Sequence, residues 1–224
     1  MPDFMNNCTF FVGPTLQGIE PLKHLRLDVT CLPPVRRGDV EALTSQSPPG
    51  HLVIVDGIFH QFPSVGHIEL RTALKKGWRV WGLCSMGAIR ACEMRDLGMR
   101  GYGTVYERFV QDEDFTDDEV ALLHGPAHPY PSITEPLIHM RFALDDLVTR
   151  GGLSRREAAA VVEHLSRLWF GYRTLALLRQ LVLECRPQME TGIVDTWLAN
   201  FEPFRIKSWD LWKFLQERPW QKRD

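Results

Sequence analysis

The stretch that decides the fold is Trp78–Met94, WRVWGLCSMGAIRACEM. It begins with apolar residues typical of a buried strand, passes Gly82, and continues from Gly87 with apolar residues at helical spacing. Cys84 and Ser85 stand at the junction. A strand that turns sharply into a helix, with a hydroxyl or thiol at the turn, has the arrangement of a nucleophile elbow. The N–H groups in the first turn of such a helix stabilise developing negative charge.

The pattern departs from the usual Gly-x-Ser-x-Gly. Gly87 stands two residues after Ser85, but Leu83 occupies the position of the first glycine. The alternative interpretation is a serine that caps a helix beside a buried Cys84. Both interpretations place the pair at the carboxyl end of a strand.

Upstream of this stretch, the residues HLVIVDG at 51–57 predict a central strand of a parallel sheet, because apolar residues follow one another without alternation. A helix is expected over 63–76, which completes a βαβα unit with a right-handed crossover. Asp56 and Gly57 follow the strand at the edge where open α/β sheets bind ligands, although a loop carboxylate that caps a turn fits as well. The predicted fold class is α/β: a mostly parallel sheet with flanking helices and a helical C-terminal third.

The N-terminal part adds two further strands to this sheet, at Thr9–Val12 and Leu25–Val29. Gly13 and Pro14 follow the first of them in a tight loop, which either presents backbone N–H groups to a ligand or is a simple turn.

Charged residues near the predicted strand ends are candidates for a site. Arg36 and Arg37 precede Asp39, so they form either an anion site or the solvated start of a helix. His67 and Glu69 are two residues apart and do not share a helix face, but at a helix start both can reach one site.

The second half of the chain is predicted to be helical. Six carboxylates in 112–119 indicate either a magnesium site or a capping box at Thr116–Glu119, and two further boxes at Ser132–Glu135 and Ser154–Glu157 predict helix starts. The aromatic C-terminal region places Trp209, Trp212 and Leu215 on one helical face, which packs on the domain or docks a partner. We expect an α/β core over 1–150 and a helical extension over 151–224.

Bulk properties exclude several classes of protein. A net charge of -2 provides no basic excess for nucleic acid. No segment is long and apolar enough to span a membrane, and the N-terminus has no signal-peptide pattern, so a cytoplasmic protein is expected. The five cysteines form no C-x-x-C pair, so neither structural zinc nor a disulfide framework is predicted. No metal and no cofactor are expected.

Taken together, these motifs and several others resemble the TfuA-like family, in the right order over about residues 9–145. The matching pieces are Gly13-Pro14-Thr15-Leu16, the segment 33–39, Val55-Asp56-Gly57, His67 with Glu69-Leu70, the segment 82–93, Gly98-Met99, Gly101, Gly103, the segments 117–121 and 124–126, and the helix 135–141.

The resemblance implies a role in thioamidation of a peptide backbone. TfuA-like proteins act beside YcaO proteins, which use ATP to activate a backbone amide. The TfuA-like partner is understood to hydrolyse the C-terminal thiocarboxylate of a small ubiquitin-like sulfur carrier, and to help the YcaO protein engage its precursor peptide. The implied partners are therefore a YcaO protein, the carrier and the peptide.

The resemblance also implies a hydrolase-like site with a Ser–Lys pair, and the family serine falls on Ser85. Two departures bear on it: Cys84 stands where a second serine is usual, and Ile68 stands where the family commonly has lysine. A serine hydroxyl needs an adjacent base, whereas a thiol at a helix N-terminus needs less help. Either Cys84 works with His67, or Ser85 uses His67, Lys75 or Lys76, or catalysis is lost.

Three functions remain open from the sequence. The first is a thiocarboxylate hydrolase, with Ser85, Cys84, His67, Glu69 and Asp56 as catalytic candidates. Its substrate-binding candidates are Gly13, Pro14, Arg36, Arg37, Gly57, Gly87 and Arg90, and bidentate arginines suit the carboxyl end of a carrier. The second function is a non-catalytic accessory subunit of a YcaO complex, and the third is a general serine or cysteine thioesterase.

Overall fold

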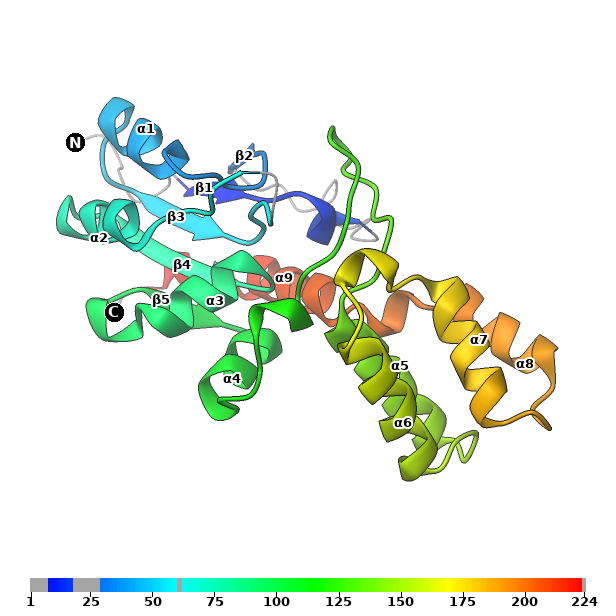
Figure 1. Cartoon of the computed structure of the whole chain (residues 1–224). Coiled ribbons are helices and arrows are strands. Elements are labelled where there is room, and N and C mark those ends of the chain that lie inside the picture. Colours follow the sequence, from blue (N-terminus) through cyan, green and yellow to red (C-terminus); the bar gives the residue numbers. More distant parts are fainter. Residues whose placement is uncertain (1–7, 18–28, 60–61, 223–224) are drawn as a thin grey trace. The chain divides into compact units, whose positions relative to one another are not determined.

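The protein contains a five-stranded parallel sheet with the strand order β2-β1-β3-β4-β5 (Figure 1). This is a computed structural model, and it describes residues 8–17, 29–59 and 62–222. The strands are β1 (Cys8–Phe11), β2 (Thr30–Leu32), β3 (His51–Ile54), β4 (Arg79–Leu83) and β5 (Arg100–Tyr102). This order is that of a doubly wound sheet whose direction of winding changes between β1 and β3. The predicted α/β class and parallel sheet are confirmed.

The central strands are buried on both faces, which explains their unbroken apolar sequence. On one face, Leu52 and Ile54 pack with residues of α1 (Asp39–Gln46), α2 (His67–Lys75) and α3 (Met86–Glu93). On the opposite face, Val53 and Val55 pack with residues of α9 (Ile206–Glu217). The C-terminal helix therefore closes the sheet that the N-terminal strands begin.

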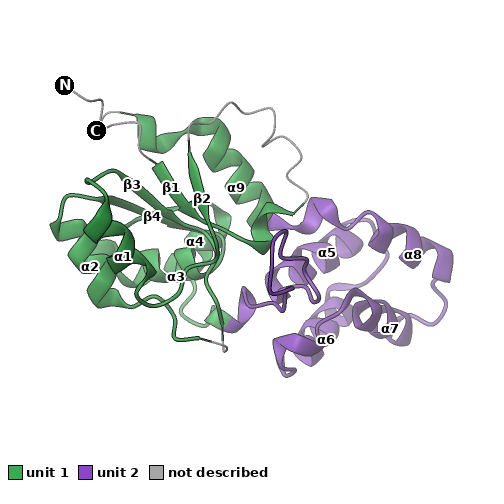
Figure 2. Cartoon of the chain, turned by 90° about the horizontal axis from the view of Figure 1, so that it is seen from above, with its two compact units in different colours: residues 1–117, 207–224 green, residues 118–206 purple. Residues whose placement is uncertain are grey.

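The chain divides into two compact units (Figure 2). The first comprises residues 1–117 and 207–224, and the second residues 118–206. The first unit also contains α4 (Thr104–Gln111). This division differs from the expected one at residue 150, because α9 completes the sheet unit and α5 belongs with the helices that follow it.

The second unit is helical, with α5 (Leu137–Thr149), α6 (Arg155–Ser166), α7 (Leu175–Cys185) and α8 (Thr191–Ala199). Its core is a separate apolar cluster in which Leu144, Leu165, Leu178, Val182 and Val194 are almost fully buried. A helical C-terminal region was expected, and the structure confirms it.

Of the two capping boxes predicted here, one is confirmed. Ser154 Oγ accepts from the N–H of Glu157 at 3.2 Å, and Glu157 Oε2 accepts from the N–H of Ser154 at 2.6 Å. The box at Ser132–Glu135 is wrong, because α5 begins only after Pro136 and Glu135 binds other side chains.

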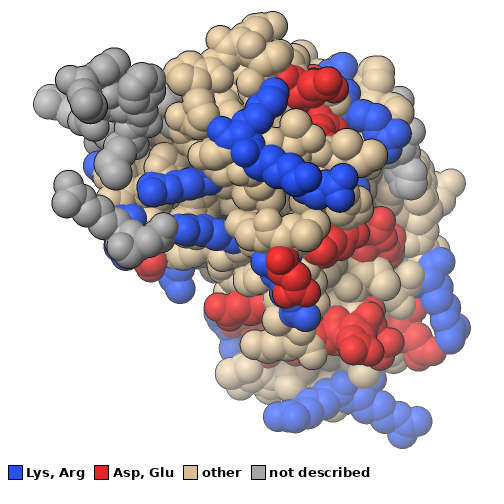
Figure 3. Space-filling model, turned by 90° about the vertical axis from the view of Figure 1, so that its left-hand side faces the viewer, with Lys and Arg blue, Asp and Glu red and all other residues tan. Residues whose placement is uncertain are grey.

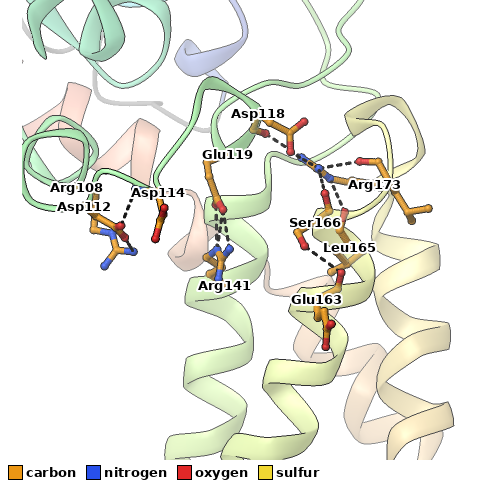
Figure 4. Close-up of polar contacts among 11 residues, drawn as sticks. Arg108, Asp112, Asp114, Asp118, Glu119, Arg141, Glu163, Leu165, Ser166 and Arg173 are labelled. Carbon is orange, nitrogen blue, oxygen red and sulfur yellow. Dashed lines mark hydrogen bonds and ion pairs between the residues drawn. The ribbon is translucent and has the colours of Figure 1, made fainter. Parts of the chain in front are cut away.

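The helix expected from Thr116–Glu119 is also absent, and only a single 3₁₀ turn, Asp117–Glu119, forms there. Its acids pair with arginines that lie later in the chain instead of with helix N–H groups. Arg141 Nη2 lies 2.6 Å from Glu119 Oε1, and Arg173 donates to Asp118 (Figure 4). The guanidinium of Arg173 also donates to the carbonyl groups of Leu165 and Leu168. Buried charge needs such complete pairing, and here it outweighs the local helix signal.

The buried face of α9 differs from the predicted one. Lys207, Asp210, Leu211, Phe214 and Leu215 are buried, whereas Trp209 is 46% exposed. The helix packs on the sheet through a stripe that includes two charged residues. The expected strand Leu25–Val29 lies mostly outside the described residues, and the observed strand β2 begins just after it.

Candidate functional site

The turn between β4 and α3 has the geometry of an elbow. Cys84 has a φ of +66°, which is uncommon for a residue with a side chain. Ser85 is the N-cap of α3, and its N–H donates to Leu83 O at 2.8 Å. Backbone strain of this kind concentrates at functional sites, because only surrounding structure can hold it.

Close packing holds this turn in place. A Cβ atom at Gly87 would lie 1.7 Å from Ile54 O, and one at Gly82 would lie 2.0 Å from Gly87 O. A Cβ at Gly57 would lie 2.6 Å from Met86 Cγ. Gly57 and Gly87, which the sequence offered as substrate-binding residues, therefore allow the first turn of α3 to press against β3 and β4.

Cys84 faces inward and not toward solvent. Its side chain is fully buried, and Sγ donates to Lys207 O at 3.1 Å. Burial raises the pKa of the Cys84 thiol well above its ordinary value, the charges of Asp210 and Asp56 add to the rise, and Lys207 opposes it. The thiol is therefore protonated at neutral pH, which is the opposite of an activated cysteine.

Ser85 is 3% exposed, and its hydroxyl makes no capping bond to α3. The N–H of Gly87 donates to Val55 O at 3.3 Å. Within the described part of the chain, the N–H of Met86 donates to no acceptor. The residue after the nucleophile supplies the oxyanion-hole N–H of an elbow, and Met86 has that position relative to Ser85.

Asp56 joins the ends of two strands. Its carboxylate accepts from Gly13 N at 2.9 Å, Thr15 N at 3.0 Å and Thr15 Oγ1 at 2.6 Å. The side chain is 2% exposed, and these bonds fix the Gly13–Pro14 loop after β1. The acid predicted as catalytic thus organises the switch point of the sheet, where ligands of doubly wound folds bind.

The other two catalytic candidates lie away from Ser85. Glu69 accepts from Gly66 N at 2.8 Å and Gly38 N at 3.0 Å, so it ties together the starts of α1 and α2. His67 Nε2 lies 2.9 Å from Glu93 Oε2. Because Glu93 is eight residues beyond Ser85, it lies about 12 Å further along α3. The structure does not bring His67 and Ser85 together.

The lysines considered as bases lie near the amino ends of the strands, opposite to the end at which Ser85 lies. Lys75 ends α2 and Lys76 caps it, just before the amino end of β4, whereas Ser85 follows its carboxyl end. Ile68, which stands in place of the family lysine, is 74% exposed.

The three arginines predicted to bind substrate, Arg36, Arg37 and Arg90, all contact one segment, residues 62–65. The guanidinium of Arg36 lies 4.4 Å from the centre of the Phe62 ring, and Arg37 Nε donates to Ser64 O at 3.3 Å. Arg90 Nε donates to Val65 O at 2.9 Å. Arginines from two places in the sequence, 36–37 and 90, thus hold the chain before α2.

Two residues at this end of the sheet were missed by sequence reasoning. Lys207 and Asp210 are each 2% exposed and lie on α9. Asp210 accepts from the N–H groups of Thr104 and Val105, both at 2.9 Å, although burial raises its pKa. The helical spacing of the apolar residues Leu211, Phe214 and Leu215 predicts which face of α9 is buried. Lys207 and Asp210 fall on that same face.

Neither a metal site nor a membrane span is found where the structure describes the chain. No group of three His, Cys, Asp or Glu side chains in residues 8–17, 29–59 and 62–222 is placed to hold a metal ion. No helix in the same ranges is long and apolar enough to cross a bilayer.

Both signs of charge occupy the face drawn in Figure 3, with acidic side chains mainly in its lower half.

The family model described as TfuA-like protein matches residues 56–174, more than half of the chain. The chain therefore belongs to the TfuA-like family. Membership links it, at the level of the family, to thioamidation by YcaO proteins. The match includes the elbow and the Asp118–Arg173 pair. A search of the curated proteins found no match.

Proposed function

We propose that the protein assists YcaO-dependent thioamidation by hydrolysing a thiocarboxylated, ubiquitin-like sulfur carrier, with Ser85 as the nucleophile. The observation that carries the proposal is the strained turn at Cys84, which sets Ser85 at the N-cap of α3 beside the unused N–H of Met86. Such a turn presents a hydroxyl next to a donor for the oxyanion.

In the proposed reaction, Ser85 Oγ attacks the thiocarboxylate carbon and loses its proton to a base. The tetrahedral oxyanion accepts a hydrogen bond from Met86 N–H. As it collapses, the base returns the proton to the departing sulfur, which leaves as hydrosulfide while the acyl–serine forms. Water then cleaves the acyl–serine, which returns the carrier carboxylate and the serine hydroxyl. The released sulfide supplies the YcaO partner, which we propose also binds its precursor peptide more tightly with this protein present.

The proton acceptor that we favour is Lys207, because its backbone carbonyl touches the elbow and its side chain is fully buried. A lysine acts as a general base through its neutral amine. His67 and Lys75 lie too far from Ser85 for this role.

The test is sulfide release from a thiocarboxylated carrier by the purified protein, with and without its YcaO partner. Ser85→Ala should reduce the rate by at least about a thousandfold. Cys84→Ser should keep most of the rate, because it restores the hydroxyl usual in the family. Lys207→Met tests the base, and its rate should recover as pH rises if hydroxide replaces the amine. Full activity of Ser85→Ala would overturn the proposal.

A non-catalytic accessory role is the second candidate. It is favoured by the 3% exposure of Ser85 and by the pairing of His67 with Glu93, away from the elbow. In that case the wild-type protein releases no sulfide but still lowers the KM of the YcaO partner for its peptide. For either role we propose a cytoplasmic location.

A further inference from the structure

A groove of about 370 Å³ runs along α3 and the end of α4. We call it the acidic groove, because the charged side chains among its described lining residues are four carboxylates and a single arginine. The carboxylates belong to Glu93, Asp112, Glu113 and Asp117, and the arginine is Arg90. All of its lining residues belong to the first compact unit.

Among the described residues that line the groove, the only positive charge, on Arg90, is already engaged. Arg90 Nε donates to Val65 O at 2.9 Å, Arg90 Nη1 lies 2.6 Å from Glu93 Oε2, and only 15% of the side chain is exposed. Asp112 is paired with Arg108, which lies outside the lining. The groove therefore keeps an excess of negative charge and opposes a carboxylate, including the carboxyl end of a sulfur carrier at Arg90.

Apolar side chains also line this acidic groove. They are Phe59, Met86, Ile89, Phe109 and Phe115. Phe109 and Phe115 stack edge to face with their ring centres 4.6 Å apart, which makes part of the lining rigid. Apolar surface beside carboxylates fits a ligand with apolar and cationic side chains close together.

We infer that the acidic groove binds an extended peptide segment in which Lys or Arg stands next to an apolar residue. Met86 lines the groove and directly follows Ser85, so a segment bound there lies beside the elbow. The inference rests on the proposed function in one respect: it gives the charge and apolar character of the peptide whose binding the protein promotes.

Binding is measured with the full chain and a short dye-labelled peptide in which arginines alternate with leucines, by fluorescence anisotropy at low salt. A matched peptide carries glutamates in place of the arginines. We expect the arginine peptide to bind at least about tenfold more tightly, and the preference to fall as salt is added. A third peptide, with serines in place of leucines, should also bind more weakly, because the apolar contact is lost.

Two neighbouring residues provide a matched pair of variants. Glu113→Lys reverses a charge in the lining, whereas Asp114→Lys makes the same change in an exposed side chain outside it. Glu113→Lys should weaken the arginine peptide about three- to tenfold, and Asp114→Lys less than about twofold. Equal effects of the two variants, or equal binding of the arginine and glutamate peptides, would overturn the inference. Because no turnover is measured, failure here leaves the sulfide-release result standing, and the reverse also holds.

Discussion

The thiol of Cys84 donates to the backbone carbonyl of Lys207 across 123 positions of sequence, at 3.1 Å. This bond joins the strained end of β4 to the first turn of α9. Both side chains are buried, so the bond is shielded from water. The geometry of the elbow therefore depends on a helix at the far end of the chain, outside the region that defines the family.

A prediction for stability follows at Cys84. Cys84→Ser retains a donor for Lys207 O and should change the free energy of unfolding by less than about 1.5 kcal/mol. Cys84→Val loses the donor and places a β-branched side chain at a φ of +66°. It should cost about 2–4 kcal/mol. Urea unfolding compares the two variants, and similar losses in both would show that the bond and the strain contribute little.

The second prediction concerns the glycine in the first turn of α3. Gly87→Ala would place a Cβ 1.7 Å from Ile54 O, a backbone atom that cannot move aside alone. We expect a loss of about 3 kcal/mol or more in unfolding free energy, or no folded protein. Gly192→Ala in α8 is the control, because nothing lies within 4 Å of its Cβ position. It should stabilise the protein by about 0.5–1 kcal/mol through helix propensity. A fully stable Gly87→Ala protein would contradict the close packing of the elbow.

The elements around the elbow could be predicted from the sequence because local signals agree there. The apolar run at 51–54, the strand before Cys84 and the helical spacing after Gly87 each point to one structure. The strand-to-helix turn with Ser85 at its end was inferred for the same reason.

The environment of each candidate side chain could not be predicted, since it depends on distant partners. The carboxylate of Asp56 accepts hydrogen bonds from Gly13 and Thr15, which lie more than 40 positions away in the sequence. The thiol of Cys84 donates to the backbone carbonyl of Lys207. The capping signal at Thr116–Glu119 failed because Asp118 and Glu119 pair with Arg173 and Arg141. Such pairings leave no trace in a local pattern.

A third prediction tests whether Asp56 stabilises the fold by binding the loop that follows β1. Asp56→Ala removes the acceptor of three hydrogen bonds and leaves the N–H groups of Gly13 and Thr15 buried without partners. It should cost about 3–5 kcal/mol, because charge-assisted bonds contribute about 1.5–3 kcal/mol each and are not fully additive. Thr15→Val removes only the shortest of the three bonds and should cost about 1–2 kcal/mol. A loss of sulfide release in Asp56→Ala without a loss of stability would instead indicate a role in the reaction.

The last prediction concerns acid stability of the second unit. Glu135 is 5% exposed, and its Oε2 lies 2.9 Å from His139 Nδ1, while Oε1 lies 2.6 Å from Arg205 Nη2. Burial alone would raise the pKa of Glu135, but the bonds and charges of His139 and Arg205 outweigh it and hold the pKa below its ordinary value.

The folded-state pKa of Glu135 is thus lower than the unfolded value of about 4.3. Its contribution to stability is fully present above that value and is lost as pH falls through the lower folded-state pKa. Glu135→Gln should cost about 3 kcal/mol at pH 7, because Arg205 loses a buried partner, and progressively less as the pH falls below the unfolded value, where the wild type begins to lose the same contribution. Asp145→Asn, an exposed acid on the same helix, should keep the acid dependence of the wild type. Urea unfolding across this range decides the matter: an equal cost of Glu135→Gln at every pH would mean that Glu135 acts by its shape and not by its charge.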